Sequence, residues 1–145
     1  MVDPKRQAEL RDAIEGMFFS YRAFTERPDR ILERRGLGRV HHRILYFVGR
    51  HPDVSISGLL DILDVSKQAL NAPLRQLIEM KLLTATANAE DRRIRNLGLT
   101  REGRDLEAEL TGAQMRHLEA ALSHAGPDAE AGWRKVMAQL LAQHA

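Results

Sequence analysis

Apolar residues recur at three- and four-residue spacing over most of this chain, which is the pattern of amphipathic helices. The first stripe begins at Ile14; Pro28 interrupts it briefly, and Gly36 ends it. A second apolar face over 40–48 stops before Pro52, because the residue preceding a proline is pushed out of the helical region. The N-terminal part of the chain is therefore predicted to form two helices.

Two shorter helices are predicted in the middle of the chain. Ser57 is the expected N-cap of the first, and Val54 and Ile56 before it predict a very short strand. Ser66 is the expected N-cap of the second helix, whose two faces differ in character. Its core face holds Leu70, Leu74, Leu77 and Ile78, and its opposite, polar face holds Gln68, Asn71, Ala72 and Arg75.

A β-hairpin is predicted directly after this helix. Apolar residues alternate over 83–87 and again over 97–99, so two short strands share one buried face. The loop between the strands has an acidic and then doubly basic tip, formed by Asp91, Arg92 and Arg93. Asp91 is placed to orient Arg93 through a charge-assisted hydrogen bond.

Two further helices are predicted after the hairpin. Thr100 is the expected cap of the first, which runs to about Leu122, and Pro127 begins the second. The last helix, like the first helix of the chain, carries an apolar stripe far in sequence from the central module. We expect a second copy of the chain to cover both stripes in a homodimer. The positions expected to be buried there are Phe18, Trp133 and Leu140.

The order of these elements predicts a mainly α fold with a small β-hairpin wing. The chain is read as a single domain of 145 residues with a winged helix-turn-helix core over about 38–100. Terminal dimerisation helices are expected over about 5–35 and 101–144.

Composition narrows the class of protein. No apolar run approaches the roughly 20 residues that cross a membrane, and the N-terminus lacks the apolar core of a signal peptide. The absence of cysteine excludes disulfides and thiolate zinc ligands and fits a cytoplasmic protein. The six histidines do not converge as zinc ligands would, and no nucleophile–base pair or phosphate-binding loop is present. We therefore expect no metal, no cofactor and no enzymatic activity.

Charge is distributed unevenly along the chain. Residues 66–104 carry eight basic and four acidic side chains, whereas residues 105–145 carry three basic and six acidic ones. This local excess of positive charge suits a polyanion such as double-stranded DNA, although a solvated surface without a partner explains charge alone equally well. The residues that we expect to bind DNA are Ser66, Lys67, Gln68, Asn71, Arg75, Asp91, Arg92, Arg93 and Arg95.

The DNA-binding residues divide by chemistry. Arg75 suits a bidentate contact with guanine, and Gln68 or Asn71 suits adenine, in a major groove that admits one helix. Ser66 and Lys67 at the helix start suit phosphate. The wing arginines suit the narrow, electronegative minor groove. Two alternatives remain: a winged helix that docks a protein and never touches DNA, and a small-ligand-binding protein whose DNA lobe is vestigial.

The chain resembles the MarR (multiple antibiotic resistance regulator) family of winged-helix transcription factors over nearly its whole length. The resemblance is most specific where Asp91-Arg92-Arg93 precedes Leu99-Thr100-Arg101-Glu102-Gly103, and it extends to the turn at 63–70. It implies a homodimer, built by the first and last two helices, that regulates transcription from pseudo-palindromic DNA. It also implies, in many members, release of the DNA by a small, often aromatic anion.

Three departures from the family pattern concern the DNA-binding module. Pro73 lies inside the predicted recognition helix, where it removes a hydrogen bond to the Ala69 carbonyl and is expected to kink the helix or change its entry angle. Residues 87–90 lack an upstream basic residue, and residues 81–83 lack the usual glycine. The DNA sequence that relatives read therefore does not transfer to this chain.

An effector site is the last expectation. Without cysteine, thiol oxidation is excluded as the signal, so a ligand that shifts the population of two states is the simplest switch. Aromatic and cationic side chains suit an aromatic carboxylate, although a plain dimer core explains them equally well. The candidate lining is Phe18, Tyr21, Arg22, His41 and His42.

Overall fold

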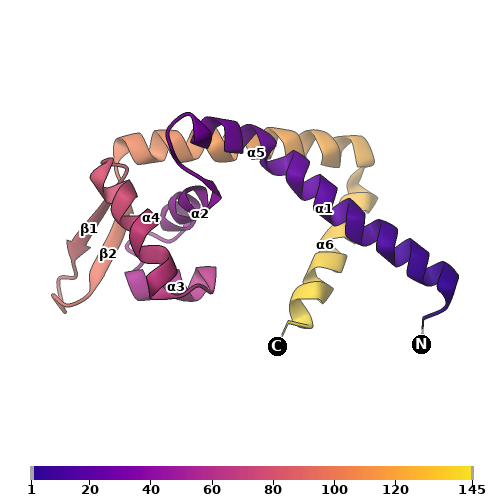
Figure 1. Cartoon of the computed structure of the whole chain (residues 1–145), viewed down its shortest axis with the longest axis horizontal. Coiled ribbons are helices and arrows are strands. Elements are labelled where there is room, and N and C mark those ends of the chain that lie inside the picture. The colour runs from indigo at the N-terminus through magenta and orange to yellow at the C-terminus, as the bar shows by residue number, and fades with distance from the viewer. Residues whose placement is uncertain (1, 145) are drawn as a thin grey trace. The chain divides into compact units, whose positions relative to one another are not determined.

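The computed structural model describes residues 2–144 and contains six helices and one two-stranded antiparallel sheet within that range (Figure 1). The predicted fold class, mainly α with a β-hairpin wing, is confirmed. The elements are α1 (Pro4–Glu33), α2 (Arg39–Arg50), α3 (Ile56–Leu63), α4 (Lys67–Glu79), β1 (Leu83–Ala87), β2 (Arg95–Leu99), α5 (Arg101–Ala125) and α6 (Pro127–Ala142).

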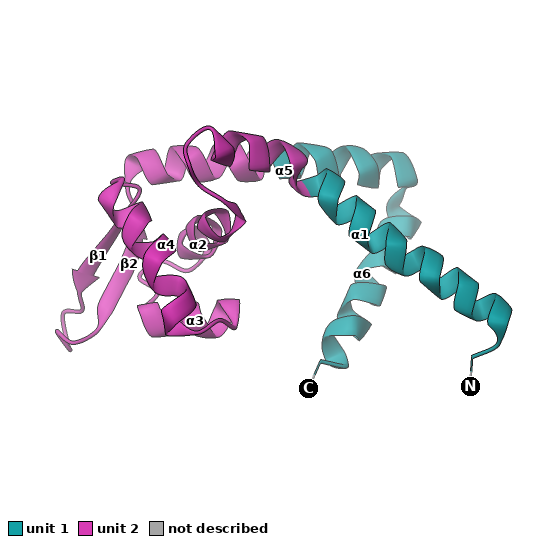
Figure 2. Cartoon of the chain, viewed as in Figure 1, with its two compact units in different colours: residues 1–24, 113–145 teal, residues 25–112 magenta. Residues whose placement is uncertain are grey.

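The chain forms two compact units, and the boundaries between them fall inside α1 and inside α5 (Figure 2). One unit comprises residues 25–112 and contains α2, α3, α4 and the hairpin. The other comprises residues 1–24 and 113–145. The functional division expected from sequence, with a DNA-binding lobe over about 38–100, stays a prediction.

Leucine side chains dominate the core of unit 25–112. Helix α2 packs against α3, α4 and β2, so it lies at the centre of this unit. Ile44 and Leu45 on α2 are fully buried, as are Leu59 on α3 and Leu77 on α4. Burial of side chains of this size stabilises a fold by about 1.5–3 kcal/mol each. The amphipathic patterns predicted for these helices are therefore the patterns that build the core.

Hydroxyl side chains begin three of the helices. The Ser66 hydroxyl accepts a hydrogen bond from the Ala69 N–H at 3.1 Å, as predicted for the start of α4. The Thr100 hydroxyl likewise accepts from the Gly103 N–H at 3.0 Å at the start of α5. The expectation that Ser57 caps α3 is wrong, because Ser55 is the N-cap and accepts from the Gly58 N–H.

Two other expectations near these helices need correction. Val54 and Ile56 do not form a strand, because Ile56 already begins α3. The segment instead makes an isolated bridge between Ser55 and Asn96, and the Leu97 N–H donates to the Val54 carbonyl at 2.8 Å. Pro28 does not interrupt α1, which continues to Glu33 with the proline buried. A proline removes one hydrogen bond from a helix, and a long helix tolerates that loss where tertiary packing compensates for it.

The predicted hairpin is present, and its register places Leu83 opposite Leu99 and Ala85 opposite Leu97. The base of the hairpin lies against the first turn of α5, where Gly103 is close to the backbone of Leu82, the residue before β1. A Cβ at this position would lie 2.0 Å from the Leu82 carbonyl oxygen, so only glycine fits there. The Thr100 N–H also donates to the Leu82 carbonyl at 3.1 Å, so the base of the hairpin is joined to the start of α5.

Apolar exposure is concentrated in the unit formed by 1–24 and 113–145. Of the exposed large hydrophobic side chains among the described residues, all but Ile62, Val65 and Ile94 belong to this unit. No described residue of α6 is buried in the single chain. The three positions expected at a dimer interface are 60% (Phe18), 41% (Trp133) and 51% (Leu140) exposed.

Candidate nucleic-acid interface

The helix-turn-helix consists of α3, a tight turn and α4. The turn depends on Asp64, which ends α3 in the left-handed conformation with φ of 52°. The Val65 N–H then bonds the Leu60 carbonyl, and Ser66 caps α4. Aspartate is among the few non-glycine residues that adopt this conformation readily, which explains why it stands between the two helices.

The two faces of α4 are separated as the sequence predicts. Leu70, Leu74 and Leu77 are buried, whereas Gln68, Asn71 and Arg75 are exposed. Helix α4 is continuous through Pro73. One helix thus offers solvent a surface of amide and guanidinium groups while its apolar face anchors it to the core.

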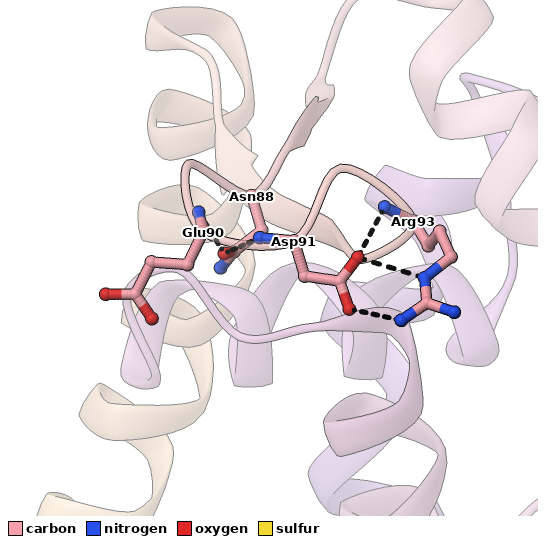
Figure 3. A network of polar contacts seen from close by, with 4 residues as sticks. All are labelled: Asn88, Glu90, Asp91 and Arg93. Carbon is pink, nitrogen blue, oxygen red and sulfur yellow. Dashed lines mark hydrogen bonds and ion pairs between the residues drawn. The ribbon is translucent and has the colours of Figure 1, made fainter.

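The wing loop is organised by Asn88 (Figure 3). Its side-chain oxygen accepts hydrogen bonds from the backbone N–H groups of Glu90, at 2.8 Å, and Asp91, at 3.0 Å. Its own N–H bonds the Ile94 carbonyl across the loop at 2.8 Å. Asn88 is not among the functional residues predicted from the sequence. The feature that could have identified it is an asparagine at the start of a turn, where the side chain imitates a backbone turn.

Asp91 holds Arg93 by a two-pronged ion pair (Figure 3). The carboxylate accepts from Nε and from Nη2 of Arg93, both at 3.1 Å, and from its backbone N–H at 3.0 Å. These bonds hold the pKa of the Asp91 carboxyl below its usual value. An exposed pair adds little to stability, so its main effect is to fix the direction of a guanidinium whose side chain is 91% exposed.

The nine residues predicted to contact DNA all lie in unit 25–112. Eight of them are exposed and Asp91 is half-buried. They form two groups, one on α4 with its N-cap and one on the wing. The Ser66 hydroxyl oxygen is used by the helix cap, so its O–H remains as the group that can donate to a phosphate. DNA contact by these residues stays a prediction.

The candidate ligand residues are divided between the two units. His41 and His42 lie on α2 and are buried, with 8% and 9% of their surface exposed. The others lie on α1 in the other unit, where the Arg22 guanidinium stands 5.9 Å from the Phe18 ring centre and 5.4 Å from that of Phe19. Ligand binding by this set stays a prediction.

The two histidines are hydrogen-bonded to different helices. His41 Nε2 lies 2.8 Å from Gln76 Oε1 on α4, and His42 Nε2 lies 3.1 Å from Thr111 Oγ1 on α5. Adjacent residues on a helix point about 100° apart, which is why the pair contacts two neighbours. Burial lowers the pKa of His42, and the nearby Glu107 carboxylate offsets part of that effect.

Within residues 2–144, no three histidine, aspartate or glutamate side chains are arranged to hold a metal ion. In the same part of the chain, no helix has the length and apolar character needed to span a bilayer.

The helix-turn-helix and its arginine-tipped hairpin together define a winged helix-turn-helix protein. A sequence model of the MarR family matches residues 35–94. The HTH-type transcriptional regulator PetP of Rhodobacter capsulatus is 44% identical over 133 residues, which is 92% of this chain and 80% of that protein. The chain belongs to the MarR family of winged helix-turn-helix transcriptional regulators.

Solved structures show the same fold at lower identity. A MarR family transcription regulator superposes with a TM-score of 0.78 at 22% identity, covering 97% of each chain. Staphylococcus aureus MarR in complex with salicylate and kanamycin gives 0.75 at 22% identity, again covering 97% of each chain. A mutant of S. aureus MepR bound to an oligodeoxyribonucleotide gives 0.64 at 17% identity, covering 90% of this chain and 96% of that one.

The buried His42 predicts an acid-sensitive fold. In the unfolded chain this histidine takes up a proton near its reference pKa of about 6.5, whereas the folded protein keeps it neutral to lower pH. The free energy of unfolding should therefore fall as the pH drops through about 6.5 and stop falling, on this account, below the lowered folded pKa. Urea unfolding between pH 8 and pH 5 measures this dependence.

His42→Gln is the control for the pH measurement, because glutamine can still donate to Thr111 but does not titrate. The wild type should lose more stability on acidification than the variant does. Equal losses in the two proteins would contradict the assignment of this pH dependence to His42.

Proposed function

We propose that this MarR-family regulator is a cytoplasmic homodimer that represses transcription by binding a pseudo-palindromic DNA site. The observation that carries the proposal is the pre-oriented Arg93 guanidinium in the same compact unit as the bare polar face of α4. A helix with an apolar back and a hydrogen-bonding front fits the major groove, and an exposed guanidinium suits the minor groove. In this account Asn71 and Arg75 read bases, Lys67 and the Ser66 O–H hold phosphate, and Arg92, Arg93 and Arg95 bind at the wing.

The DNA part of the proposal is supported by a relative. The MepR mutant with the same fold is bound to an oligodeoxyribonucleotide. The chemistry of this chain agrees with that role, because residues 66–104 carry eight basic side chains against four acidic ones.

The dimer part is supported by the apolar surface of the unit formed by 1–24 and 113–145. Met17 and Phe18 on α1 and Val136 and Leu141 on α6 are each at least 60% exposed in the single chain. Soluble monomers rarely leave large apolar patches uncovered, and two copies related by a twofold axis would cover them. The same symmetry would place two α4 helices about one turn of DNA, roughly 34 Å, apart.

The effector part is supported by aromatic and cationic side chains on α1. The S. aureus MarR structure contains salicylate, an aromatic anion, and kanamycin. Arg22 and the neighbouring rings of Phe18 and Phe19 supply the cationic and aromatic groups that such an anion prefers. We therefore propose that a small aromatic acid releases the DNA by binding better to a dimer whose α4 helices no longer match the groove spacing.

Arg93→Ala is the variant that tests DNA binding at the wing. It should weaken binding to DNA from the upstream region of the protein's own gene and to shuffled DNA alike, and lower the salt slope by about one. Fluorescence anisotropy at several salt concentrations measures both quantities. Asn71→Ala should instead reduce the preference for this DNA over a shuffled sequence.

Arg27→Ala is the matched control, because Arg27 is an exposed arginine of the same unit that lies outside α4 and the wing. It should leave DNA affinity and salt slope unchanged. If the wild type bound upstream and shuffled DNA equally well, the proposal of a sequence-specific regulator would be wrong, and a protein-docking role for the winged helix would be favoured.

Leu140→Glu tests the dimer. Light scattering after gel filtration should give the wild type twice the 16.4 kDa mass of the chain at micromolar concentration. A charge introduced into the apolar stripe of α6 should shift that mass toward the monomer, because an unpaired charge at an interface is costly. Gln139→Glu adds the same group to the same helix off the stripe and should remain dimeric. A monomeric wild type would refute the dimer.

A further inference from the structure

Gln76 joins three segments that are far apart in the sequence. It lies on α4, directly after the proposed base-reading residue Arg75, and is half-buried. Its Oε1 lies 2.8 Å from His41 Nε2 on α2, and its Nε2 donates to the Gly36 carbonyl, 3.3 Å away, in the turn between α1 and α2. Both ends of the amide are therefore engaged, one with a side chain and one with the backbone.

The other ring nitrogen of His41 fixes how this contact works. The Gly38 backbone N–H donates to His41 Nδ1 at 2.9 Å, so Nδ1 has no hydrogen when that bond is made. The hydrogen of the neutral ring must then be on Nε2, which donates it to Gln76. The segment 36–41 and Gln76 thus form a closed set of directional bonds, here called the Gln76 clamp, composed of Gly36, Gly38, His41 and Gln76.

The apolar stripe of α4 sets which face of the helix is exposed, and a directional bond can restrain the remaining small rotations about the helix axis. Burial of Leu70, Leu74 and Leu77 turns this face towards the core, but the hydrophobic effect is non-directional and tolerates small rotations. Pro73 removes the hydrogen bond that the Ala69 carbonyl would otherwise accept, so the helix is less tightly tied midway along its length. Gln76 lies three residues beyond that proline, where a directional bond best restrains the second half of α4.

We propose that Gln76 and His41 are positioning residues for DNA recognition. Within the orientation that leucine burial sets, the clamp restrains the fine rotation of α4 and so determines how Asn71 and Arg75 are presented to the major groove. This inference rests on the proposed DNA-binding function and adds two residues that need not touch DNA. It predicts that breaking the clamp lowers discrimination between DNA sequences while the electrostatic, sequence-independent part of binding is retained.

Two substitutions of His41 separate the clamp from simple helix capping. His41→Gln places an amide nitrogen near the position of Nε2 and keeps a donor for Gln76, but it loses the acceptor for the Gly38 N–H. His41→Asn places an oxygen near the position of Nδ1 and keeps the bond from Gly38, but it is too short to reach Gln76. A third variant, Gln76→Leu, removes the amide on α4 that His41 and Gly36 bind and replaces it with a side chain of similar size.

The first measurement is the ratio of affinities for upstream and shuffled DNA, with the thermal midpoint measured in parallel. His41→Asn and Gln76→Leu should each lower the ratio by about tenfold, the effect of loosening one good base contact. The double variant should be no worse than either single variant, because both remove one interaction. His41→Gln should keep the wild-type ratio even if its thermal midpoint falls.

A ratio that follows the thermal midpoint in all variants, or that stays at the wild-type value in His41→Asn, would overturn the inference. Equal binding of both DNAs by the wild type would instead refute the proposed function. Amide hydrogen exchange of the protein without DNA then tests separately whether the clamp restrains α4. Exchange over residues 71–79 should speed up in His41→Asn and Gln76→Leu but not in His41→Gln, and unchanged exchange in all three would overturn the clamp.

Discussion

The burial of one face of α4 is the interaction on which the rest of the structure depends. Leu70, Leu74 and Leu77 are almost completely removed from solvent, which stabilises the fold by about 1.5–3 kcal/mol for each side chain. A helix cannot bury its whole circumference at the edge of a small unit, so the face that carries Asn71 and Arg75 stays exposed. The core that folds the protein therefore also creates the surface that we assign to DNA.

Directional hydrogen bonds fix the orientation of polar side chains, which hydrophobic burial does not determine. The first turn of α2 contributes two adjacent histidines, one bonded to α4 and one bonded to Thr111 on α5. Because Thr111 donates its own hydrogen to Glu107, it must accept from His42, which fixes that ring as well. On the wing, Asn88 bonds the backbone N–H of Asp91, and the Asp91 carboxylate orients Arg93. On α2 and on the wing alike, a hydrogen-bonded polar side chain determines the orientation of a neighbouring side chain or helix.

The elements that could be predicted from the sequence are those with local causes. The stripe of α4, its Ser66 cap and the alternation in the hairpin each follow from neighbouring residues, and so does the Asp91–Arg93 pair. The cap of α3 could not be assigned from the sequence, because Ser55 and Ser57 are equally good caps and only packing selects between them. The partners of His41 and His42, which lie 35 and 69 residues away along the chain, depend on how the helices pack and have no local signal.

The most direct test of the central claim is to map which DNA bonds each part of the protein approaches. The chain has no cysteine, so a single introduced thiol can carry an iron chelate that cleaves nearby DNA. Ala72→Cys on α4 and Ala89→Cys on the wing leave the proposed contact residues intact, and Ala129→Cys on α6 is the control. The account predicts cleavage around major-groove positions from residue 72, flanking minor-groove cleavage from residue 89, and none from residue 129. Cleavage from residue 129 alone, or from none of the three on bound DNA, would contradict it.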